Sequence, residues 1–365
     1  MEIYKMYEKI KILYISVRSD VGGGPKHISQ LLKNFDHQKY DVYIACPDDE
    51  PFYKLFVNYL GQEKVFQIPH RTFSIKHILA IKNRISKNEI AIVHSHGKGA
   101  GIYSRLLKIL DPKLKVIHTY HGIHYKGYNK FQKSLYFFME FTLSFITKKI
   151  ICVSESEKEE AITKKITHNS KKLTTIINGV TVPETMKNKE INKEINIVIV
   201  SRFDYQKNTG LLISNIKNIL ENIDFKINFY LLGTGEEQYL LNNIKEEHPN
   251  NIFILNNISN PSLYYEKCHF ILNTSRWEGL PLSVLEAMAH GCIPILTNVT
   301  GNKDIIATSN PNMGLLYNET HEVIDYLQKF LLKEIDFKNS SKINYDIAHK
   351  LYNEKKMIKE TFNLY

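Results

Sequence analysis

Short runs of β-branched and other apolar residues alternate with amphipathic helical patterns along most of the chain, and this series occurs twice. Strands that alternate with helices form parallel sheets whose two faces are covered by those helices. The first series predicts strands at Lys11–Val17, Tyr40–Cys46, Lys64–Ile68, Ile90–His96, Lys115–His121, Lys149–Ser154 and Leu173–Gly179. The second predicts strands at Ile195–Phe203, Phe225–Gly233, Asn251–Leu255, His269–Ser275 and Cys292–Asn298. We therefore expect an α/β protein of two Rossmann-like domains with a cleft between them.

A polar, proline-containing segment, Thr181–Asn196, separates the two series and is the predicted linker. With 365 residues, the chain is long enough for each domain to bury a core of its own. The expected domains are residues 1–182 and 183–340. The charged tail, residues 341–365, is expected to form a helix that packs back on the N-terminal domain.

The composition is that of an ordinary globular protein, with 43% hydrophobic and 24% charged residues. The longest apolar run, Ser134–Ile146, is too short to span a bilayer and contains Glu140. The N-terminus lacks the small-residue cleavage site of a signal peptide. The cysteines are Cys46, Cys152, Cys268 and Cys292. Their scattered, apolar surroundings predict reduced core residues in a cytoplasmic protein.

Positive charge is concentrated in the first half of the chain. Residues 1–180 hold 29 Lys and Arg against 16 Asp and Glu, a net charge of +13, whereas the remainder holds 19 against 22, a net charge of −3. This asymmetry indicates an anionic partner of the first domain, either nucleic acid or an anionic membrane surface. No recognised RNA- or DNA-binding motif is present, so we expect no nucleic-acid partner. Solvated surface lysines remain the simpler alternative.

Two segments of the first domain combine cations with apolar residues. His70–Lys87 has the pattern of a basic amphipathic helix, and Tyr125–Phe141 interleaves aromatic residues with lysines. Such surfaces can lie at an anionic interface, although a helix packed on the sheet gives nearly the same pattern. The hypothesis is a peripheral protein on the cytoplasmic face of the plasma membrane.

Ligands of open parallel sheets bind outside the carboxyl ends of the strands, so the motifs there carry the candidate site. A tri-glycine turn that includes Gly23 and Gly24 follows the first strand and opens a helix, whose N-terminal N–H groups favour anions. It is not G-x-G-x-x-G, and it could be only a tight connection. Arg202 and Lys207 follow the first strand of the second domain and could clamp a diphosphate, or be two surface cations.

Further along the second domain, the segment "SRWEGLPLSVLEAMAHG" (residues 275–291) carries two glutamates. Pro281 makes a single helix through both of them improbable, because proline lacks an N–H and disfavours the α conformation of the preceding residue. We predict a turn that carries Glu278, followed by a helix over Leu282–Ala289 that carries Glu286. Earlier, "LLGTGEE" places Gly233 and Gly235 after a strand, where a backbone could approach a ligand closely.

Histidines recur in "VHSH" and "HTYHGIH", which raises the question of a metal. A zinc site needs three or four converging ligands, and His118 and His121 straddle a strand end, so their side chains should point to opposite sides. We expect no metal site. His121 is the better candidate for a contact with a sugar hydroxyl, and His94 is expected to be a hydrogen-bonded core residue. The chain also contains no D-x-D motif that would hold a nucleotide diphosphate through a divalent cation.

The ordered set "GGGPKH", "VHSHGKGAG", "HTYHG", "ICVSES", "INGV", "SRFDYQKN", "LLGTGEE" and "SRWEGLPLSVLEAMAHGCIPI" resembles the retaining glycosyltransferase family 4, which has the GT-B fold. The resemblance runs over about residues 10–310, with the E-x7-E element and the Arg–Lys pair as its most specific motifs. It implies catalytic roles for His121, Arg202, Lys207 and Glu278. It implies contacts to the nucleotide sugar from Gly23, Gly24, Gly233, Gly235, Leu280, Leu282, Ser283 and Glu286.

In that scheme Glu278 contacts the transferred sugar, Glu286 contacts the ribose, and His121 also contacts the sugar. Arg202 and Lys207 neutralise the leaving nucleoside diphosphate in place of a metal. The resemblance also implies a same-face displacement, in which the departing phosphate helps to deprotonate the acceptor.

The implied donor is a nucleotide diphosphate sugar, with a UDP-sugar favoured over a GDP-sugar. The implied acceptor is a lipid-pyrophosphate-linked glycan in the assembly of a bacterial O antigen or capsule. Neither a cofactor nor a metal is implied beyond the donor itself. A nucleotide-sugar epimerase of the same fold and a non-catalytic nucleotide-binding module remain the alternatives.

Overall fold

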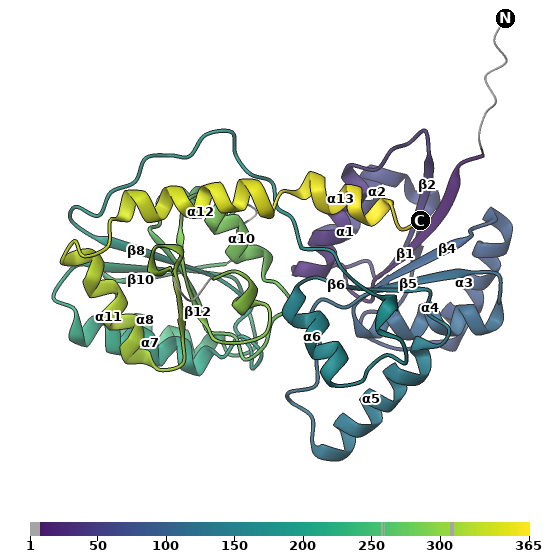
Figure 1. Cartoon of the computed structure of the whole chain (residues 1–365), viewed down its shortest axis with the longest axis horizontal. Helices are drawn as coiled ribbons and strands as arrows, with labels where there is room; N and C mark the ends of the chain where they lie inside the picture. The colour runs from purple at the N-terminus through teal and green to yellow at the C-terminus, as the bar shows by residue number, and fades with distance from the viewer. Residues whose placement is uncertain (1–7, 257, 259, 307–309) are drawn as a thin grey trace, which may run out of the picture. The chain divides into compact units, whose positions relative to one another are not determined.

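The computed structural model describes residues 8–256, 258, 260–306 and 310–365, and the chain divides into two compact units (Figure 1). The first unit comprises the residues up to Asn178 together with Lys355–Tyr365, and the second comprises Gly179–Glu354. Each is a parallel sheet with helices on both faces, as the alternating pattern predicts.

In the first unit, seven parallel strands lie in the order β3-β2-β1-β4-β5-β6-β7. The strands are β1 (Ile10–Ile15), β2 (Tyr40–Cys46), β3 (Val65–Gln67), β4 (Ile92–His96), β5 (Lys115–Thr119), β6 (Lys149–Cys152) and β7 (Leu173–Thr175). The helices are α1 (Gly23–Lys33), α2 (Phe52–Leu60), α3 (Ile75–Asn88), α4 (Lys98–Leu110), α5 (Lys130–Ser144), α6 (Glu155–Thr163) and the C-terminal α13 (Glu354–Phe362). Strand order runs outward in both directions from β1 and β4, so a topological switch point lies between them.

The second unit repeats this topology with six parallel strands in the order β10-β9-β8-β11-β12-β13. The strands are β8 (Ile195–Val200), β9 (Ile227–Leu232), β10 (Ile252–Leu255), β11 (Phe270–Asn273), β12 (Ile293–Thr297) and β13 (Leu315–Tyr317). The helices are α7 (Thr209–Asn222), α8 (Gln238–Glu247), α9 (Ser262–Tyr265), α10 (Leu282–Ala289), α11 (Thr320–Leu331) and α12 (Phe337–Leu351). Its switch point lies between β8 and β11.

The predicted fold class is confirmed in both units, but several predicted strands end too late. The run Leu173–Gly179 forms only a three-residue strand, β7, because it lies at the sheet edge and pairs with β6 alone. The edge strand β13 was not predicted at all, since three residues carry too little periodicity to be recognised.

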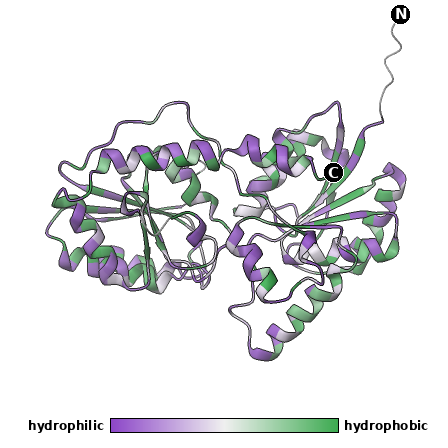
Figure 2. Cartoon of the chain, in the orientation of Figure 1, coloured by the Kyte–Doolittle hydropathy of each residue, from purple (hydrophilic) through white to green (hydrophobic). Residues whose placement is uncertain are grey.

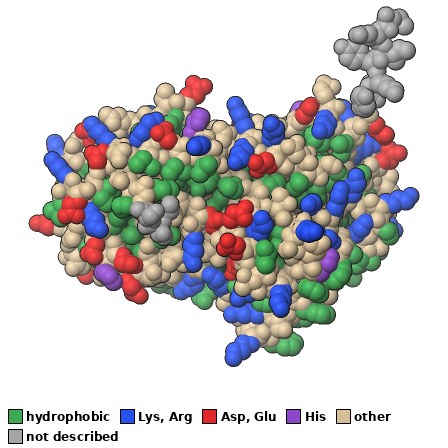
Figure 3. Space-filling model, viewed as in Figure 1, with side chains coloured by type: hydrophobic (Ala, Val, Ile, Leu, Met, Phe, Trp, Pro, Cys, Tyr) green, Lys and Arg blue, Asp and Glu red, His purple; other side chains and the backbone are tan. Residues whose placement is uncertain are grey.

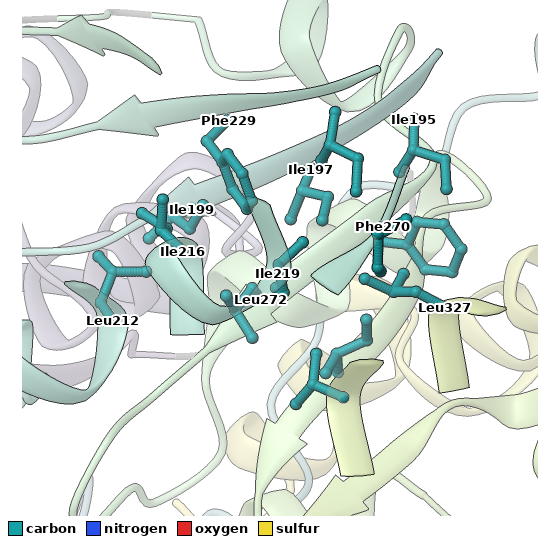
Figure 4. Packing of buried hydrophobic residues seen from close by; sticks show 14 of the residues in the cluster. Ile195, Ile197, Ile199, Leu212, Ile216, Ile219, Phe229, Phe270, Leu272 and Leu327 are labelled. Carbon is teal, nitrogen blue, oxygen red and sulfur yellow. The ribbon is translucent and has the colours of Figure 1, made fainter. Parts of the chain in front are cut away.

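Apolar side chains of the second unit's strands form its core (Figure 4). Ile197, Phe229 and Phe270 on the sheet are fully buried, and Ile216 of α7 and Leu327 of α11 pack into the same cluster. Figure 2 shows the corresponding alternation, with hydrophobic strands inside and hydrophilic residues on the outer faces of the helices. The core thus keeps the strand ends, and the loops that follow them, in fixed positions.

The charged tail forms two helices. The first, α12, belongs to the second unit, where Tyr345 and Ala348 are buried and Ser341 Oγ donates to the Gly291 carbonyl oxygen at 2.7 Å. The second, α13, packs its Met357, Ile358 and Phe362 into the core of the first unit. The tail therefore divides between the two units at the break after Leu351.

All four cysteines are buried and unpaired, as the sequence predicts. Burial raises the pKa of each thiol, so the cysteines behave as small apolar residues. In the described part of the chain, no helix combines the length and the apolar character that a membrane crossing needs.

Two glycines of the second unit offer a matched test of the packing between strand ends. A Cβ atom on Gly233, which has φ +141°, would lie 1.9 Å from the Ser201 carbonyl oxygen, whereas a Cβ atom on Gly210 of α7 would meet no atom within 4 Å. We expect Gly233→Ala to lower the free energy of unfolding by about 2 kcal/mol or more. Gly210→Ala should leave it unchanged or raise it by up to about 1 kcal/mol. Urea unfolding of both variants checks this, and equal effects would contradict it.

Candidate active site

Two loops of the second unit follow β8 and β11, the strands on either side of its switch point. Hydrogen bonds join them into one structure. Arg276 N–H donates to the Gln206 carbonyl oxygen at 2.9 Å, and Thr274 Oγ1 donates to the Lys207 carbonyl oxygen at 2.8 Å. The Gln206 amide in turn donates to the Trp277 carbonyl oxygen at 3.3 Å. These hydrogen bonds fix the positions of the side chains on one loop relative to those on the other.

The centre of this structure is an ion pair between Lys207 and Glu278, with Nζ and Oε1 2.5 Å apart. Glu278 is only 7% exposed. Its Oε1 also accepts hydrogen bonds from Ser275 Oγ at 2.7 Å and from the Asn273 amide at 3.3 Å. The carboxylate predicted to contact a sugar and the cation predicted to contact a phosphate thus lie together.

The protonation of Glu278 follows from these contacts. Burial by itself would raise the pKa of its carboxyl, but the Lys207 ammonium and the hydrogen bonds from Ser275 and Asn273 outweigh burial and lower it. The group is therefore a carboxylate at neutral pH, able to accept hydrogen bonds from hydroxyl groups and unable to donate one.

Arg202 lies at the start of the β8 loop and is partly exposed. Its guanidinium contacts the Asp204 carboxylate at 3.1 Å and donates to Gln206 Oε1 at 3.1 Å. Asp204 also accepts from the Lys207 N–H at 3.0 Å, so it fixes the loop that carries both cations. The sequence places Arg202 and Lys207 near each other, but the structure gives each of them a different carboxylate partner.

The helix predicted over Leu282–Ala289 is α10, with the bounds expected from Pro281. Leu280 and Leu282 are buried, and Ser283 is half-buried at its N-terminal end. Glu286 is half-buried on the helix, where Tyr265 Oη donates to its Oε2 at 3.4 Å. The backbone N–H groups of the first turn and the Glu286 carboxylate therefore belong to one short, otherwise buried helix.

Gly233 and Gly235 follow β9, and both lie against the loop after β8. A Cβ atom on Gly235 would lie 2.1 Å from the Phe203 carbonyl oxygen. Glycine is therefore required here to let two protein backbones approach each other, which already accounts for both residues without a ligand.

In the first unit, His121 follows β5 and has φ +100°, a conformation that costs a residue other than glycine about 1–3 kcal/mol. Its Nε2 lies 3.0 Å from Nδ1 of His96 at the end of β4. The His27 ring on α1 lies 5.0 Å from it, and a Cβ atom on Gly24 would lie 3.8 Å from it. The structure thus brings His121 next to the glycine turn, which includes Gly23 and opens α1.

These imidazoles are uncharged. Burial, together with the neighbouring histidines, lowers the pKa of His121 and of His96 well below the ordinary value. Burial likewise lowers the pKa of His27 to about 4. Two neutral rings share the hydrogen bond between His96 and His121, so one of them donates and the other accepts.

The expectation for His94 is confirmed. It is fully buried, and its two ring nitrogens pair with Tyr365 Oη at 2.6 Å and Thr119 Oγ1 at 2.7 Å. Within the ranges that the structure describes, no group of three or more His, Cys, Asp or Glu residues is arranged to hold a metal ion.

Sequence reasoning gave no orienting role to the residues that hold the predicted ones, and it considered His96 only in the question of a metal. Ser275 and Asn273 hold Glu278, Asp204 holds Arg202, and His96 holds His121. Ser275, Asp204 and His96 lie inside recognised motifs and Asn273 lies just before one, but the motifs do not show which side chain each of them contacts. Only the rule that ligands gather at a switch point could have directed attention to them.

Two family models of glycosyltransferases match the parts of the chain that carry these loops. A family model described as "Glycosyltransferase Family 4" matches residues 21–182, and one described as "Glycosyl transferases group 1" matches residues 182–347. The first covers the glycine turn and the histidines, and the second covers Arg202, Lys207, Glu278 and Glu286. The two matches follow each other along the chain without a gap.

Relatives that match most of the chain are also glycosyltransferases. The chain is 25% identical over 349 residues to a UDP-Gal:alpha-D-GlcNAc-diphosphoundecaprenol alpha-1,3-galactosyltransferase of Escherichia coli, covering 88% of each chain. It is 26% identical over 321 residues to the O-antigen biosynthesis glycosyltransferase WbnH of the same species, covering 86% of this chain and 87% of WbnH.

Among solved structures, HepE of Anabaena in complex with UDP and glucose has a TM-score of 0.78 at 13% identity, covering 97% of this chain and 99% of HepE. This likeness concerns the fold, whereas the family matches extend to the loops that carry the site. The two family models together cover residues 21–347, and the chain is a glycosyltransferase made of a family 4 domain followed by a group 1 domain.

Proposed function

We propose that this glycosyltransferase moves a sugar from a UDP-sugar to a lipid-pyrophosphate-linked glycan during the assembly of a bacterial surface polysaccharide, O antigen or capsule. The relative from Escherichia coli that acts on a diphosphoundecaprenol-linked sugar supports the donor and the acceptor class. HepE, crystallised with UDP and glucose, supports a uridine nucleotide in a fold of this kind. A hexose and an N-acetylhexosamine are both compatible with this proposal.

The observation that carries the proposal is the Lys207–Glu278 ion pair at the switch point of the second unit. Glu278 is a buried carboxylate, and its hydrogen-bonded position suits it to accept from sugar hydroxyls. Lys207, and Arg202 on the same loop, supply positive charge for the diphosphate. A nucleotide sugar combines these two chemistries in one molecule.

The remaining donor contacts complete the proposal. Backbone N–H groups around Leu280, Leu282 and Ser283, at the start of α10, receive phosphate oxygens, and Glu286 receives the ribose hydroxyls. In the first unit, His121 contacts the donor sugar, and Gly23 and Gly24 leave room for phosphate and acceptor. Gly233 and Gly235 shape the donor site by keeping the loops after β8 and β9 close together.

The proposed reaction retains the anomeric configuration. The bond between the anomeric carbon and the β-phosphate oxygen breaks, and a bond to the acceptor hydroxyl oxygen forms on the same face of the sugar. The acceptor's proton passes to the departing phosphate oxygen. Arg202 and Lys207 stabilise the negative charge that develops there, so the proposal requires neither a metal nor another cofactor.

A lipid-linked acceptor also sets the location that we propose, which is the cytoplasmic side of the plasma membrane with peripheral contact to anionic lipids. The net charge of +13 on residues 1–180 supports such a contact.

Donor binding tests the proposal directly. In the presence of EDTA, we expect one UDP-sugar from a panel of UDP-, GDP- and ADP-sugars to bind the protein. Arg202→Ala/Lys207→Ala should weaken this affinity by roughly 100-fold or more, because two charge-assisted contacts to the diphosphate are lost. Ligand-observed NMR measures the affinities.

Two controls accompany this measurement. Lys217→Ala removes a cation whose exposed ion pair with Glu247 lies on α7 and α8, and it should leave binding unchanged. Arg202→Ala alone spares the buried pair and should weaken binding roughly tenfold. Binding that is indifferent to these substitutions, or that requires a divalent cation, would overturn the proposed donor site. Turnover of the donor without an acceptor would favour an epimerase.

Stability against pH tests the state of Glu278. Its pKa in the folded protein lies below the ordinary 4.5, so its contribution to the free energy of unfolding is present above about pH 4.5 and is lost as the pH falls through the folded pKa. Glu278→Gln should therefore destabilise the protein by about 3 kcal/mol at pH 7. The difference in the free energy of unfolding between this variant and the wild type should become smaller below about pH 4.5.

Thermal unfolding between pH 3 and pH 8 measures this difference. Glu247→Gln, in the exposed pair with Lys217, serves as the matched control and should change the stability by less than about 1 kcal/mol. A difference for Glu278→Gln that stays constant down to pH 3 would contradict the ionised state.

A further inference from the structure

Helix α5 of the first unit has its apolar side facing solvent. Phe131, Leu135 and Phe138 are 77%, 57% and 65% exposed. Tyr136 and Glu140, together with Ser144, are the buried positions of the helix. At about 100° per residue, these two sets lie roughly 180° apart around the axis. A helix on the surface of a globular protein normally has the opposite arrangement, with its apolar stripe toward the core.

Polar contacts hold the inner face of α5 in place. The Glu140 carboxylate pairs with Arg105 at 3.0 Å, both side chains being fully buried, and it accepts from Tyr120 Oη at 3.0 Å. At the C-terminal end, Lys172 Nζ donates to the Ser144 carbonyl oxygen at 2.8 Å. The orientation of α5 is therefore fixed by buried partners, and its apolar stripe contributes little to the folded unit.

Within the segment that carries this stripe, every exposed charge is positive. The segment Tyr125–Lys149 contains five lysines and one acid, and that acid is the buried Glu140. Lys126, Lys130 and Lys148 are exposed. Figure 3 shows hydrophobic and basic side chains together at the lower edge, where Figure 1 draws α5. A surface of exposed aromatics beside lysines complements anionic head groups above an apolar layer.

The other basic amphipathic segment of the first unit behaves differently. In α3, Ile78, Ile81 and Ile85 are buried in the core, which accounts for the apolar periodicity of that helix. Ile75 and Leu79 remain exposed on the helix, and Phe73 is exposed just before it. Of the two segments that the sequence indicates for a membrane, only α5 presents its main apolar stripe to solvent.

We propose that α5 is an interfacial membrane helix that lies in the plane of an anionic bilayer. Phe131, Leu135 and Phe138 enter the boundary between head groups and acyl chains, while the exposed Lys126 and Lys130 lie at the lipid phosphates. This deepens the proposed function, on which it rests for the lipid-linked acceptor. It names the element through which the enzyme reaches the membrane that holds this acceptor.

Partitioning of the full-length protein onto vesicles tests the proposal. We expect binding to vesicles of phosphatidylcholine with about 30% phosphatidylglycerol, and weaker binding to phosphatidylcholine alone. Phe131→Ser/Phe138→Ser should reduce partitioning at least roughly tenfold. Lys126→Gln/Lys130→Gln should reduce it roughly fivefold for each lysine and weaken its salt dependence. Co-sedimentation measures all three.

Matched variants test whether the membrane contact is made by α5, by α3 or by exposed apolar residues of the second unit. Ile75→Ser/Leu79→Ser removes the exposed apolar residues of α3, and Leu263→Ser/Leu332→Ser removes equally exposed residues of the second unit. Neither should affect partitioning. Absence of wild-type binding, or binding that persists in the α5 phenylalanine variant and is lost in the α3 variant, would overturn the proposal. So would a concentration-dependent dimer in lipid-free solution that Phe131→Ser/Phe138→Ser dissociates, because the stripe would then join two copies.

Insertion can be observed directly, because the wild-type chain contains a single tryptophan, Trp277. In Phe138→Trp, the emission of the added indole should shift to shorter wavelength and be quenched by lipids brominated on their acyl chains. Trp277 in the wild type should show neither effect. An unshifted, unquenched Phe138→Trp that still co-sediments would indicate purely electrostatic adsorption and overturn insertion of α5.

Donor binding on the same samples separates this inference from the proposed function. Phe131→Ser/Phe138→Ser lies outside the donor site and should bind the UDP-sugar with wild-type affinity. Loss of vesicle binding with intact donor binding supports the membrane role of α5. Intact vesicle binding without any donor binding would overturn the proposed function and leave the membrane helix standing.

Discussion

Parallel strands cannot be joined by hairpins, and this requirement places the active site. After each strand the chain must cross back to the side of the sheet where the strands begin. The loops that leave the strands therefore all lie at the carboxyl ends, on one side of the sheet. Because the strand order reverses between β8 and β11, the connections after these strands lead to opposite edges of the sheet. The loops that begin these connections meet at the reversal, where hydrogen bonds join them. Arg202 and Lys207 lie on one of these loops and Glu278 on the other. The first unit repeats this arrangement, with the glycine turn after β1 and His96 at the end of β4.

The charge of Glu278 explains why the loops after β8 and β11 are joined by an ion pair. A buried carboxylate is tolerated only with a charged partner and further hydrogen bonds, and Glu278 has Lys207, Ser275 and Asn273. Removing one member would leave a buried charge unpaired. The same contacts keep the carboxylate ionised and fixed before any ligand arrives, which lowers the cost of ordering the site for a sugar hydroxyl.

Sequence patterns predicted the elements of this protein better than their contacts. The start of α10 follows from Pro281, because the covalent structure of this one residue decides where the helix begins. The pairing of Lys207 with Glu278 depends on two loops that are far apart in the sequence and meet only in the folded sheet. The hydrogen bond between His96 and His121 likewise joins two strand ends that are 25 residues apart in the sequence. The tail after residue 340 was expected to pack as one helix, since its charge pattern continues past the break at Leu351.

Amphipathic periodicity shows that a helix has an apolar stripe, but it does not show which way the stripe faces. Both α3 and α5 carry apolar residues beside lysines, and their patterns are equally consistent with core packing and with a membrane surface. The residues on the opposite face of each helix decide whether its apolar stripe points to the core or to solvent. In α3 that face carries Lys76, Asn83 and Lys87, which are exposed, and the isoleucines pack inward. In α5 the buried face carries Glu140, whose carboxylate must meet Arg105 and Tyr120 inside the unit. The buried Glu140 thus leaves Phe131 and Phe138 facing outward, and it gives the first unit an apolar, basic surface on a fixed helix.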